Sequence, residues 1–314
     1  MAQSNNDSSS ELHVRVAWYY YKAEMTQEEI ATRLGLSRAR VIKVLDQCRQ
    51  EGVVSFHVNS PFTNCLQLEK QVIDRWKLRD AFIVPAVDPP MVNRNLGAAG
   101  AQYIERNLSK EETLLGFGWG NTVSLTLKHL SLMDHQKVSM VTLSGGITAY
   151  LQNTYREENN PLFKFNSRFH IIPSPLRVSS PNTCRLILEE PEVARIIQLA
   201  QLANIAVVGI GPMSANATFT QFGYITPQEL EILQKQGGVG DILGQFYDKE
   251  GNRLDVDFHN RLVAVSLEKL KTMQHVIGVA GGVHKVEAIK GALRGGYIHS
   301  LITDEKTALE LVNG

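Results

Sequence analysis

The 314-residue chain has few cysteines and no net charge, and each of these features excludes a class of protein. Its three cysteines, Cys48, Cys65 and Cys184, are far apart, with no CxxC pair and no histidine at zinc-ligand spacing. They predict neither a disulfide framework nor a metal site, and a reducing cytoplasm is the simplest compartment. Lys and Arg together number 32, as do Asp and Glu, so net charge neither favours nor excludes a nucleic-acid partner.

A long uninterrupted apolar run is also missing. Residues 196–228 carry no charge, but Gln198, Asn204, Gly209 and Pro212 interrupt them, so we expect a buried helix and strand there and no membrane span. The polar start, MAQSNNDSSS, lacks the apolar core of a signal peptide, and residues 1–10 are predicted to be a disordered leader. The remaining length predicts about two folded domains, at roughly 150 residues each.

Residues 26–48, TQEEIATRLGLSRARVIKVLDQC, predict two short helices joined by a tight turn. Thr26 can cap the first helix, with Glu29 completing a capping box. Gly35 can end that helix because glycine accepts the left-handed conformation, and Ser37 can cap the second helix. This arrangement is typical of a helix-turn-helix, whose second helix enters the major groove of DNA.

Basic side chains are concentrated on the second of these helices. Between Arg33 and Arg49 there are five basic residues and one acidic residue, Asp46. Val41, Val44, Leu45 and Cys48 fall on one stripe, so the basic side chains are expected to point outward. An ordinary helical hairpin or a protein-interaction module is the alternative, but a basic module ahead of a separate domain favours a ligand-controlled DNA-binding protein.

Two segments flank the predicted helix-turn-helix. Residues 11–24 predict an amphipathic helix, and residues 53–58 predict a strand that would form a wing. The boundary between two domains is expected near Ser60, followed by a helix in residues 61–76. The apolar positions expected on the first helix are Val14, Ala17, Trp18 and Tyr21.

Beyond residue 60, short apolar runs alternate with helical patterns, as in an α/β domain with a mostly parallel sheet. The expected strands are 81–84, 114–117, 138–143, 170–172, 205–210, 276–280 and 298–303. Glycine-rich segments lie after or near several of these strand ends. Because ligands bind at the carboxyl ends of strands in open parallel sheets, a ligand site is expected there. The segments are 116–122, 142–148, 209–214, 237–244 and 278–285.

The chemistry of these turns favours an anionic ligand. Backbone amides of Ser144, Gly145 and Gly146 could approach phosphate oxygens, and Lys285 or Arg177 could add positive charge. The segments lack a complete dinucleotide-binding fingerprint, and no GxxxxGK[ST] occurs, so neither a nicotinamide cofactor nor nucleotide hydrolysis is predicted. No other cofactor is predicted.

An enzyme acting on a sugar phosphate stays an alternative. Asp241, His284 and Lys285 could serve as acid, base and phosphate anchor. A turn-forming role for the aspartate and a surface role for the histidine are the simpler interpretations.

Several motifs, in their order and spacing, resemble the sorbose-operon-regulator (SorC) family of bacterial transcription factors over nearly the whole chain. They are MTQEEIATRLGLSRARV, GFGWG, TLSGG, VGIG, GDILGQFYD, VAGG and GGYIHSLITDE. The resemblance implies a winged helix-turn-helix domain in residues 11–60. It also implies a Rossmann-like α/β effector and oligomerisation domain in residues 61–314, related to sugar-phosphate isomerases and deaminases but without catalysis.

The resemblance further implies a cytoplasmic regulator, most often a repressor of a sugar or polyol operon. Its expected partners are near-palindromic operator DNA, a phosphorylated sugar or polyol, and further copies of the chain in a dimer or tetramer. The expected DNA-binding residues are Thr26, Gln27, Ser37, Arg38, Ala39, Arg40 and Lys43. The expected effector-binding residues are Phe117, Gly118, Ser144, Gly145, Gly146, Arg177, Asp241, Leu243 and Lys285.

Overall fold

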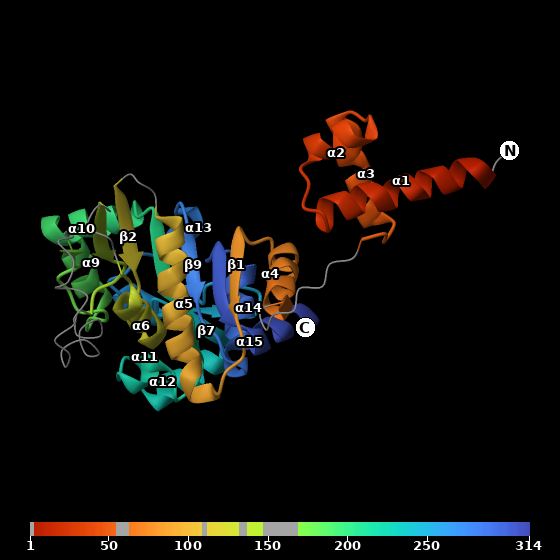
Figure 1. Cartoon of the computed structure of the whole chain (residues 1–314). Coiled ribbons are helices and arrows are strands. Elements are labelled where there is room, and N and C mark those ends of the chain that lie inside the picture. Colours follow the sequence, from red (N-terminus) through yellow and green to blue (C-terminus); the bar gives the residue numbers. More distant parts are fainter. Residues whose placement is uncertain (1–2, 55–62, 109–111, 132–136, 147–168) are drawn as a thin grey trace. The chain divides into compact units, whose positions relative to one another are not determined.

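The computed structural model describes the whole chain except residues 1–2, 55–62, 109–111, 132–136 and 147–168 (Figure 1). The chain forms two compact units, residues 1–60 and 61–314, which are described separately below.

The first unit is a bundle of three helices, α1 (Gln3–Tyr21), α2 (Gln27–Leu34) and α3 (Arg38–Gln50). The capping box between Thr26 and Glu29 begins α2, and Gly35, with a φ of 65°, ends it. Ser37 caps α3 by accepting a hydrogen bond from the backbone of Arg40. A small apolar core joins the three helices: Val16, Ala17, Ile30, Ala31, Val41, Val44, Leu45 and Cys48.

The first helix differs from its prediction in start and in orientation. It begins at Gln3, so residues 3–10 of the predicted leader are helical; the segment contains no glycine or proline that would end the helix. Of the four residues predicted on the apolar face, Ala17 is buried and Tyr21 half-buried, but Val14 and Trp18 are 53% and 57% exposed. Val16, which was not predicted there, is fully buried. Packing against α2 and α3 therefore selects a face that is rotated from the predicted one. The predicted wing strand, 53–58, lies mostly outside the described residues.

A seven-stranded parallel sheet forms the centre of the second unit, in the order β1-β10-β9-β5-β2-β3-β4. All seven predicted strands are present, and each end lies within two residues of its predicted position. They are β1 (Asp80–Val84), β2 (Thr113–Phe117), β3 (Val138–Thr142), β4 (Phe169–His170), β5 (Ile205–Gly209), β9 (Val276–Val279) and β10 (Ser300–Asp304).

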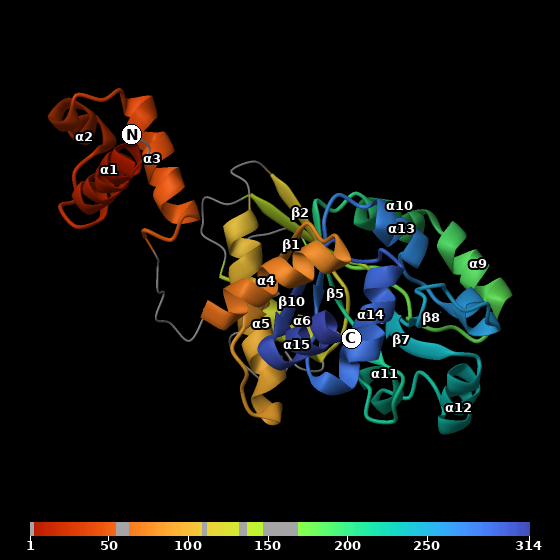
Figure 2. The ribbon, with the colours of Figure 1, turned by 90° about the vertical axis from the view of Figure 1, so that its right-hand side faces the viewer.

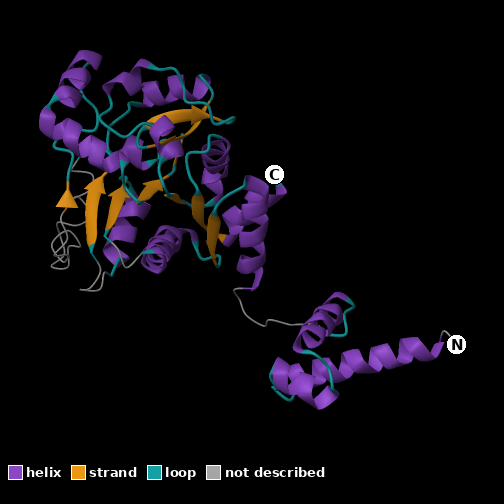
Figure 3. Ribbon diagram, turned by 90° about the horizontal axis from the view of Figure 1, so that it is seen from above, coloured by secondary structure: helices purple, strands orange, loops and turns teal. Residues whose placement is uncertain are grey.

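Helices cover both faces of this sheet (Figures 2 and 3). Helices α5 and α6 pack on one face through a core that includes Leu96, Val123 and Phe117. The other face carries a larger core with α4, α10, α14 and α15. The helices are α4 (Thr63–Trp76), α5 (Val92–Asn107), α6 (Asn121–His129), α9 (Pro181–Glu189), α10 (Pro191–Gln201), α11 (Thr218–Gln221), α12 (Pro227–Lys235), α13 (Leu267–Thr272), α14 (Val286–Arg294) and α15 (Glu305–Asn313), with 3₁₀ turns η1 (Pro89–Met91), η2 (Asp257–Arg261) and η3 (Val283–Lys285).

A second, antiparallel sheet was missed in the sequence. It contains β6 (Gly211–Pro212), β7 (Gly238–Ile242) and β8 (Gln245–Asp248). Its middle strand lies within GGVGDILG, which was predicted to be a turn near a strand end. Glycine is unfavourable in strands on average, but Gly240 is required here because a Cβ atom would lie 2.6 Å from the Cβ of Ala288 on α14.

No helix among the described residues is long and apolar enough to cross a membrane. The uncharged run predicted to be a buried helix and strand corresponds to the end of α10 and to β5.

Candidate effector cavity and DNA-binding helix

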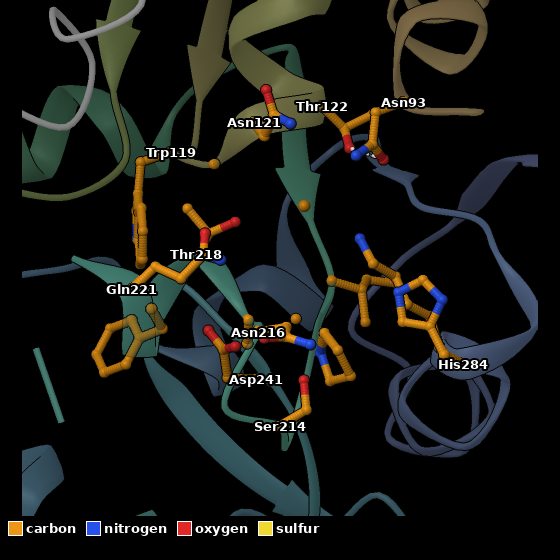
Figure 4. A pocket seen from close by; sticks show the side chains of 18 of the residues that line it. Asn93, Trp119, Asn121, Thr122, Ser214, Asn216, Thr218, Gln221, Asp241 and His284 are labelled. Carbon is orange, nitrogen blue, oxygen red and sulfur yellow. Dashed lines mark hydrogen bonds between the residues drawn. The ribbon is translucent and has the colours of Figure 1, made fainter. Parts of the chain in front are cut away.

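A cavity of about 290 Å³ opens at the carboxyl ends of β2 and β5 (Figure 4). The chain runs from β2 outward to β3 and β4 and then returns to β5 on the other side of β2, so the strand order reverses at this point. Such a switch point is where open parallel sheets form a ligand crevice. The lining residues after β2 are Trp119, Gly120, Asn121 and Thr122, and those at the end of β5 and just after it include Gly209, Ile210 and Gly211.

Asp241 is the buried acidic group of the cavity. It lies on β7, next to Gly211 on β6, where a Cβ atom would lie 2.0 Å from Oδ1 of Asp241. Its Oδ2 accepts a hydrogen bond of 3.0 Å from the backbone of Gly244. Burial raises the pKa of Asp241 to about 6, and the Gly244 bond and the charge of Lys285 only partly offset this.

Lys285 brings the complementary charge to the same cavity from the turn after β9. Burial lowers the pKa of Lys285, while the carboxylate of Asp241 acts in the opposite direction. A desolvated ammonium and a desolvated carboxylate in one cavity suit a ligand that has both an anionic group and hydroxyl groups.

His284 lies at the edge of the cavity, opposite Trp119 (Figure 4). Burial and the neighbouring Lys285 lower the pKa of His284. The turn before it is fixed by Asp304, which accepts a 2.8 Å hydrogen bond from the backbone of Gly282.

Amide and hydroxyl side chains form most of the polar lining. Asn93 on α5 accepts a 3.2 Å hydrogen bond from the hydroxyl of Thr122 on α6 (Figure 4). Such groups donate and accept hydrogen bonds without charge, which suits a ligand rich in hydroxyls. The others are Asn121, Ser214, Asn216, Thr218 and Gln221.

An aromatic cluster lies behind the wall of the cavity that faces His284. The ring of Trp119 lies 5.3 Å from that of Phe219, 6.2 Å from Phe222 and 5.4 Å from Tyr224, measured between centroids. Trp119 is 8% exposed, and its indole nitrogen is buried without a hydrogen-bond partner in the described structure. The wall therefore presents apolar surface to one side of the cavity.

Of the nine residues predicted to bind the effector, three line the cavity: Asp241, Leu243 and Lys285. Phe117 is fully buried in the core beneath it, and Gly118 is covered by the side chain of Leu243.

The TLSGG turn lies outside the cavity lining. The backbone amide of Gly145 donates to Val263, and that of Gly146 donates to Ser174, each at 2.8 Å. The hydroxyl of Ser144 donates to the backbone oxygen of Gly145 at 3.0 Å. Two of the three amides proposed for phosphate, those of Gly145 and Gly146, are thus already bonded to carbonyl groups of neighbouring loops.

Arg177 is also absent from the lining. Its guanidinium forms a two-point ion pair with Glu229, at 2.6 Å and 3.3 Å, and does not reach the cavity.

Most of the polar lining was not predicted. Asn216, Thr218 and Gln221 belong to an uncharged stretch between β6 and α12, and no spacing in the sequence identifies them. The only signal was GIGPMS, which placed the following residues after a strand end.

The predicted DNA-binding side chains lie on the surface of the first unit. Ser37, Arg38, Ala39, Arg40 and Lys43 are exposed on α3 or at its cap, and Thr26 is exposed at the start of α2. Gln27 is half-buried. Since the inward stripe of α3 is buried, its basic residues are directed outward as predicted. Within the described part of the chain, no three His, Cys, Asp or Glu side chains come together as a metal site.

Comparison with known proteins agrees with this architecture. The family described as "Putative sugar-binding domain" matches residues 60–313. The chain is 37% identical over 305 residues to the transcriptional regulator LsrR of an Enterobacter species, covering 96% of this chain and 92% of that protein. LsrR of Klebsiella pneumoniae is also 37% identical, with the same coverage.

Solved structures show the same fold. The full-length sorbitol operon regulator SorC from Klebsiella pneumoniae superposes with a TM-score of 0.72 at 26% identity, covering 96% of this chain and 98% of that one. The sugar-binding domain of a transcriptional repressor from Vibrio fischeri gives a TM-score of 0.70 at 26% identity, covering 79% of this chain and 98% of that one.

The chain therefore belongs to the SorC-type family of sugar-binding transcriptional regulators. It is a transcriptional regulator with a sugar-binding domain.

Proposed function

We propose that the protein is a cytoplasmic repressor of an operon for uptake or catabolism of a sugar or polyol. In this proposal α3 binds a near-palindromic operator as part of a homo-oligomer, and a phosphorylated sugar or polyol in the cavity controls that binding. The placement of Asp241 and Lys285 in one amide-rich cavity at the switch point of the sheet carries the proposal.

The chemistry of the cavity supports a ligand with one phosphate. Lys285 can donate charge-assisted hydrogen bonds to phosphate oxygens, and Asp241 can accept hydrogen bonds from sugar hydroxyls. The neutral amides and hydroxyls around them can bond the remaining hydroxyls of a polyol. Phosphate recognition is assigned to Lys285 and not to the TLSGG turn or Arg177, because neither lines the cavity and the amides of Gly145 and Gly146 and the Arg177 guanidinium have other partners.

We assign no catalytic role to this site. The alternative enzyme would use Asp241, His284 and Lys285, which do line one cavity. The relatives reported above are named as transcriptional regulators, and this favours ligand binding without turnover.

Calorimetric titration of the full chain tests the proposal. The probes are glucose 6-phosphate, ribose 5-phosphate and glucitol 6-phosphate, each beside its dephosphorylated form. At least one phosphorylated probe should bind, and Lys285→Ala should weaken it about tenfold or more, because a hydrogen bond to a charged group contributes about 1.5 to 3 kcal/mol.

The matched control is Lys271→Ala, which removes a lysine paired with Glu268 on the surface. It should leave binding unchanged. Equal affinity for probes with and without phosphate, or full affinity in Lys285→Ala, would refute the proposed ligand chemistry. Product formation from any probe would instead support the enzyme.

A further inference from the structure

One wall of the cavity is built from a single stretch of chain between β6 and β7. We call residues 213–235 the cavity segment. It contains α11 and α12 and provides Ser214, Asn216, Thr218, Phe219 and Gln221 to the lining. The position of this stretch therefore decides the shape of the cavity.

A hydrogen bond within the cavity segment joins its beginning to its end. Gln234 near the end of α12 donates a 2.9 Å hydrogen bond to the backbone oxygen of Met213, which closes the segment on itself. The middle of the segment, around Tyr224 and Glu229, is held from elsewhere.

Arg177 provides that second attachment, from the loop between β4 and α9. Its Nη2 donates to Oε1 of Glu229 at 2.6 Å, and its Nη1 donates to Oε2 at 3.3 Å and to the backbone oxygen of Tyr224. The guanidinium also lies over the ring of Phe258, 4.4 Å from its centroid. Because the Arg177 and Glu229 side chains are only 20% and 31% exposed, the pair is better shielded from water than a surface ion pair.

Glu229 is itself part of the start of α12. Its carboxylate accepts a 2.8 Å hydrogen bond from the backbone of Thr226, and its own backbone donates to the Thr226 hydroxyl. The nearby guanidinium lowers the pKa of Glu229, so the carboxylate is charged at neutral pH. Arg177 thus binds the capped end of α12 and Tyr224, two residues before the N-cap Thr226.

The contact is relayed to the cavity through packed aromatic rings. Phe258, beneath the guanidinium, lies 5.7 Å from Phe219, which lines the cavity. Tyr224, whose backbone Arg177 binds, has its ring 5.2 Å from Phe219 and 5.4 Å from Trp119. Side chains packed at this density cannot shift independently.

We propose that Arg177 is a positioning residue that holds the cavity segment in its ligand-binding position through Glu229 and Tyr224, and that it does not bind phosphate. This assignment replaces the phosphate-binding role predicted from the sequence. The attachment itself can be tested without a ligand, whereas its effect on affinity rests on the proposed function.

Hydrogen–deuterium exchange of the full chain measures the attachment. In Arg177→Ala and in Glu229→Gln, amides of residues 213–235 should exchange about tenfold faster, the factor that corresponds to about 1.4 kcal/mol for a hydrogen-bonded charge pair. Glutamine at this position can still complete the capping box, so Glu229→Gln removes the ion pair and keeps the cap. The double variant should exchange no faster than Arg177→Ala alone, and Arg177→Lys should be intermediate.

The matched control is Arg185→Ala, which removes an exposed arginine paired with Glu189 on α9. It should leave exchange in residues 213–235 unchanged. Unchanged exchange in both Arg177→Ala and Glu229→Gln would overturn the proposal, as would an additive effect in the double variant. If Arg177→Ala fails to fold, Glu229→Gln decides the question alone.

Titration with glucose 6-phosphate, or another probe that binds the wild type, separates the two roles of Arg177. A positioning role requires Glu229→Gln to weaken binding. A phosphate-binding role requires the opposite, because loss of the Glu229 charge would release Arg177 for the anion. If no sugar phosphate binds at all, the proposed function fails while the exchange result still decides the role of Arg177.

Discussion

At the scale of single residues, the most consequential group is the carboxyl of Asp241. It is buried beside Gly211, and among the residues that the structure describes it accepts one backbone hydrogen bond, from Gly244. A buried carboxylate with so few partners is expensive, so its pKa rises to about 6. This cost supports the proposed ligand-binding role of Asp241, since an apolar residue of similar size would stabilise the fold more.

We expect this burial to make stability depend on pH. The pKa of Asp241 is about 6 in the folded state and 3.8 ordinarily, and this difference means that protonation of Asp241 stabilises the folded state by about 3 kcal/mol. Because the folded state holds the proton more tightly, this stabilisation is fully present below pH 3.8 and is lost as pH rises through 6. Asp241→Asn should therefore unfold the second unit at higher denaturant concentration than wild type at pH 8, with the advantage shrinking toward pH 4.

Chemical denaturation between pH 4 and 8 provides the measurement. Asp74→Asn, at an exposed aspartate on α4, is the control and should follow the wild-type profile. A constant difference between Asp241→Asn and wild type over the whole range would show that the carboxyl is not buried as described.

At the scale of elements, the sequence predicts what is local and repetitive. The strands of the parallel sheet are short continuous apolar runs, and the ends of α2 and the start of α3 follow capping rules that need no tertiary contact. Strand β7 was missed because its Gly240 is required by close packing against Ala288 on α14, which lies more than 40 residues later. The face of α1 was chosen by packing in the same way.

The site shows the same division between local and distant information. The end of β9 locates Lys285, whereas Asp241 and Leu243 lie on β7 and just after it, and all three line the cavity. The partner of Arg177 is 52 residues away, so the ion pair that removes Arg177 from the lining leaves no trace in local spacing. The hydrogen-bond partners of backbone amides likewise cannot be predicted from local spacing in the sequence.

Helix α3 yields a prediction at this scale. Arg40→Ala should cost about 1 to 3 kcal/mol of binding free energy on the preferred sequence and relax base preference, if its guanidinium reads a guanine. Lys43→Ala should weaken all DNA alike and reduce the salt slope of binding by about 1, as expected for a lost phosphate contact. Affinities are compared on a site selected from random DNA by the wild type and on unselected DNA.

Lys235→Ala, an exposed lysine of the second unit, serves as the control for charge alone. It should leave both affinities unchanged. Wild-type affinities for selected and random DNA in both α3 variants would refute this docking of α3.

At the scale of the whole molecule, the small first unit sets a requirement for symmetry. A three-helix unit with α3 as its one proposed reading helix would contact only a few base pairs, which is too little for specific binding. The second unit is far larger and has its own core on both faces of the sheet, so it can associate with another copy without using the DNA-binding helix. A symmetric oligomer would place two reading helices on one duplex.

We therefore expect the preferred DNA to be a near-palindrome whose half-sites are separated by whole helical turns of about 10 base pairs. Inserting about 5 base pairs between half-sites should lower affinity strongly, because it turns one half-site to the opposite face of the duplex. Inserting about 10 base pairs should restore part of the affinity, since the faces align again and only the distance has changed. Gel-shift titration gives the affinities, and light scattering of the complex gives the number of chains bound. A single chain bound at nanomolar concentration, or affinity that ignores the 5-base-pair insertion, would show that one reading helix is enough.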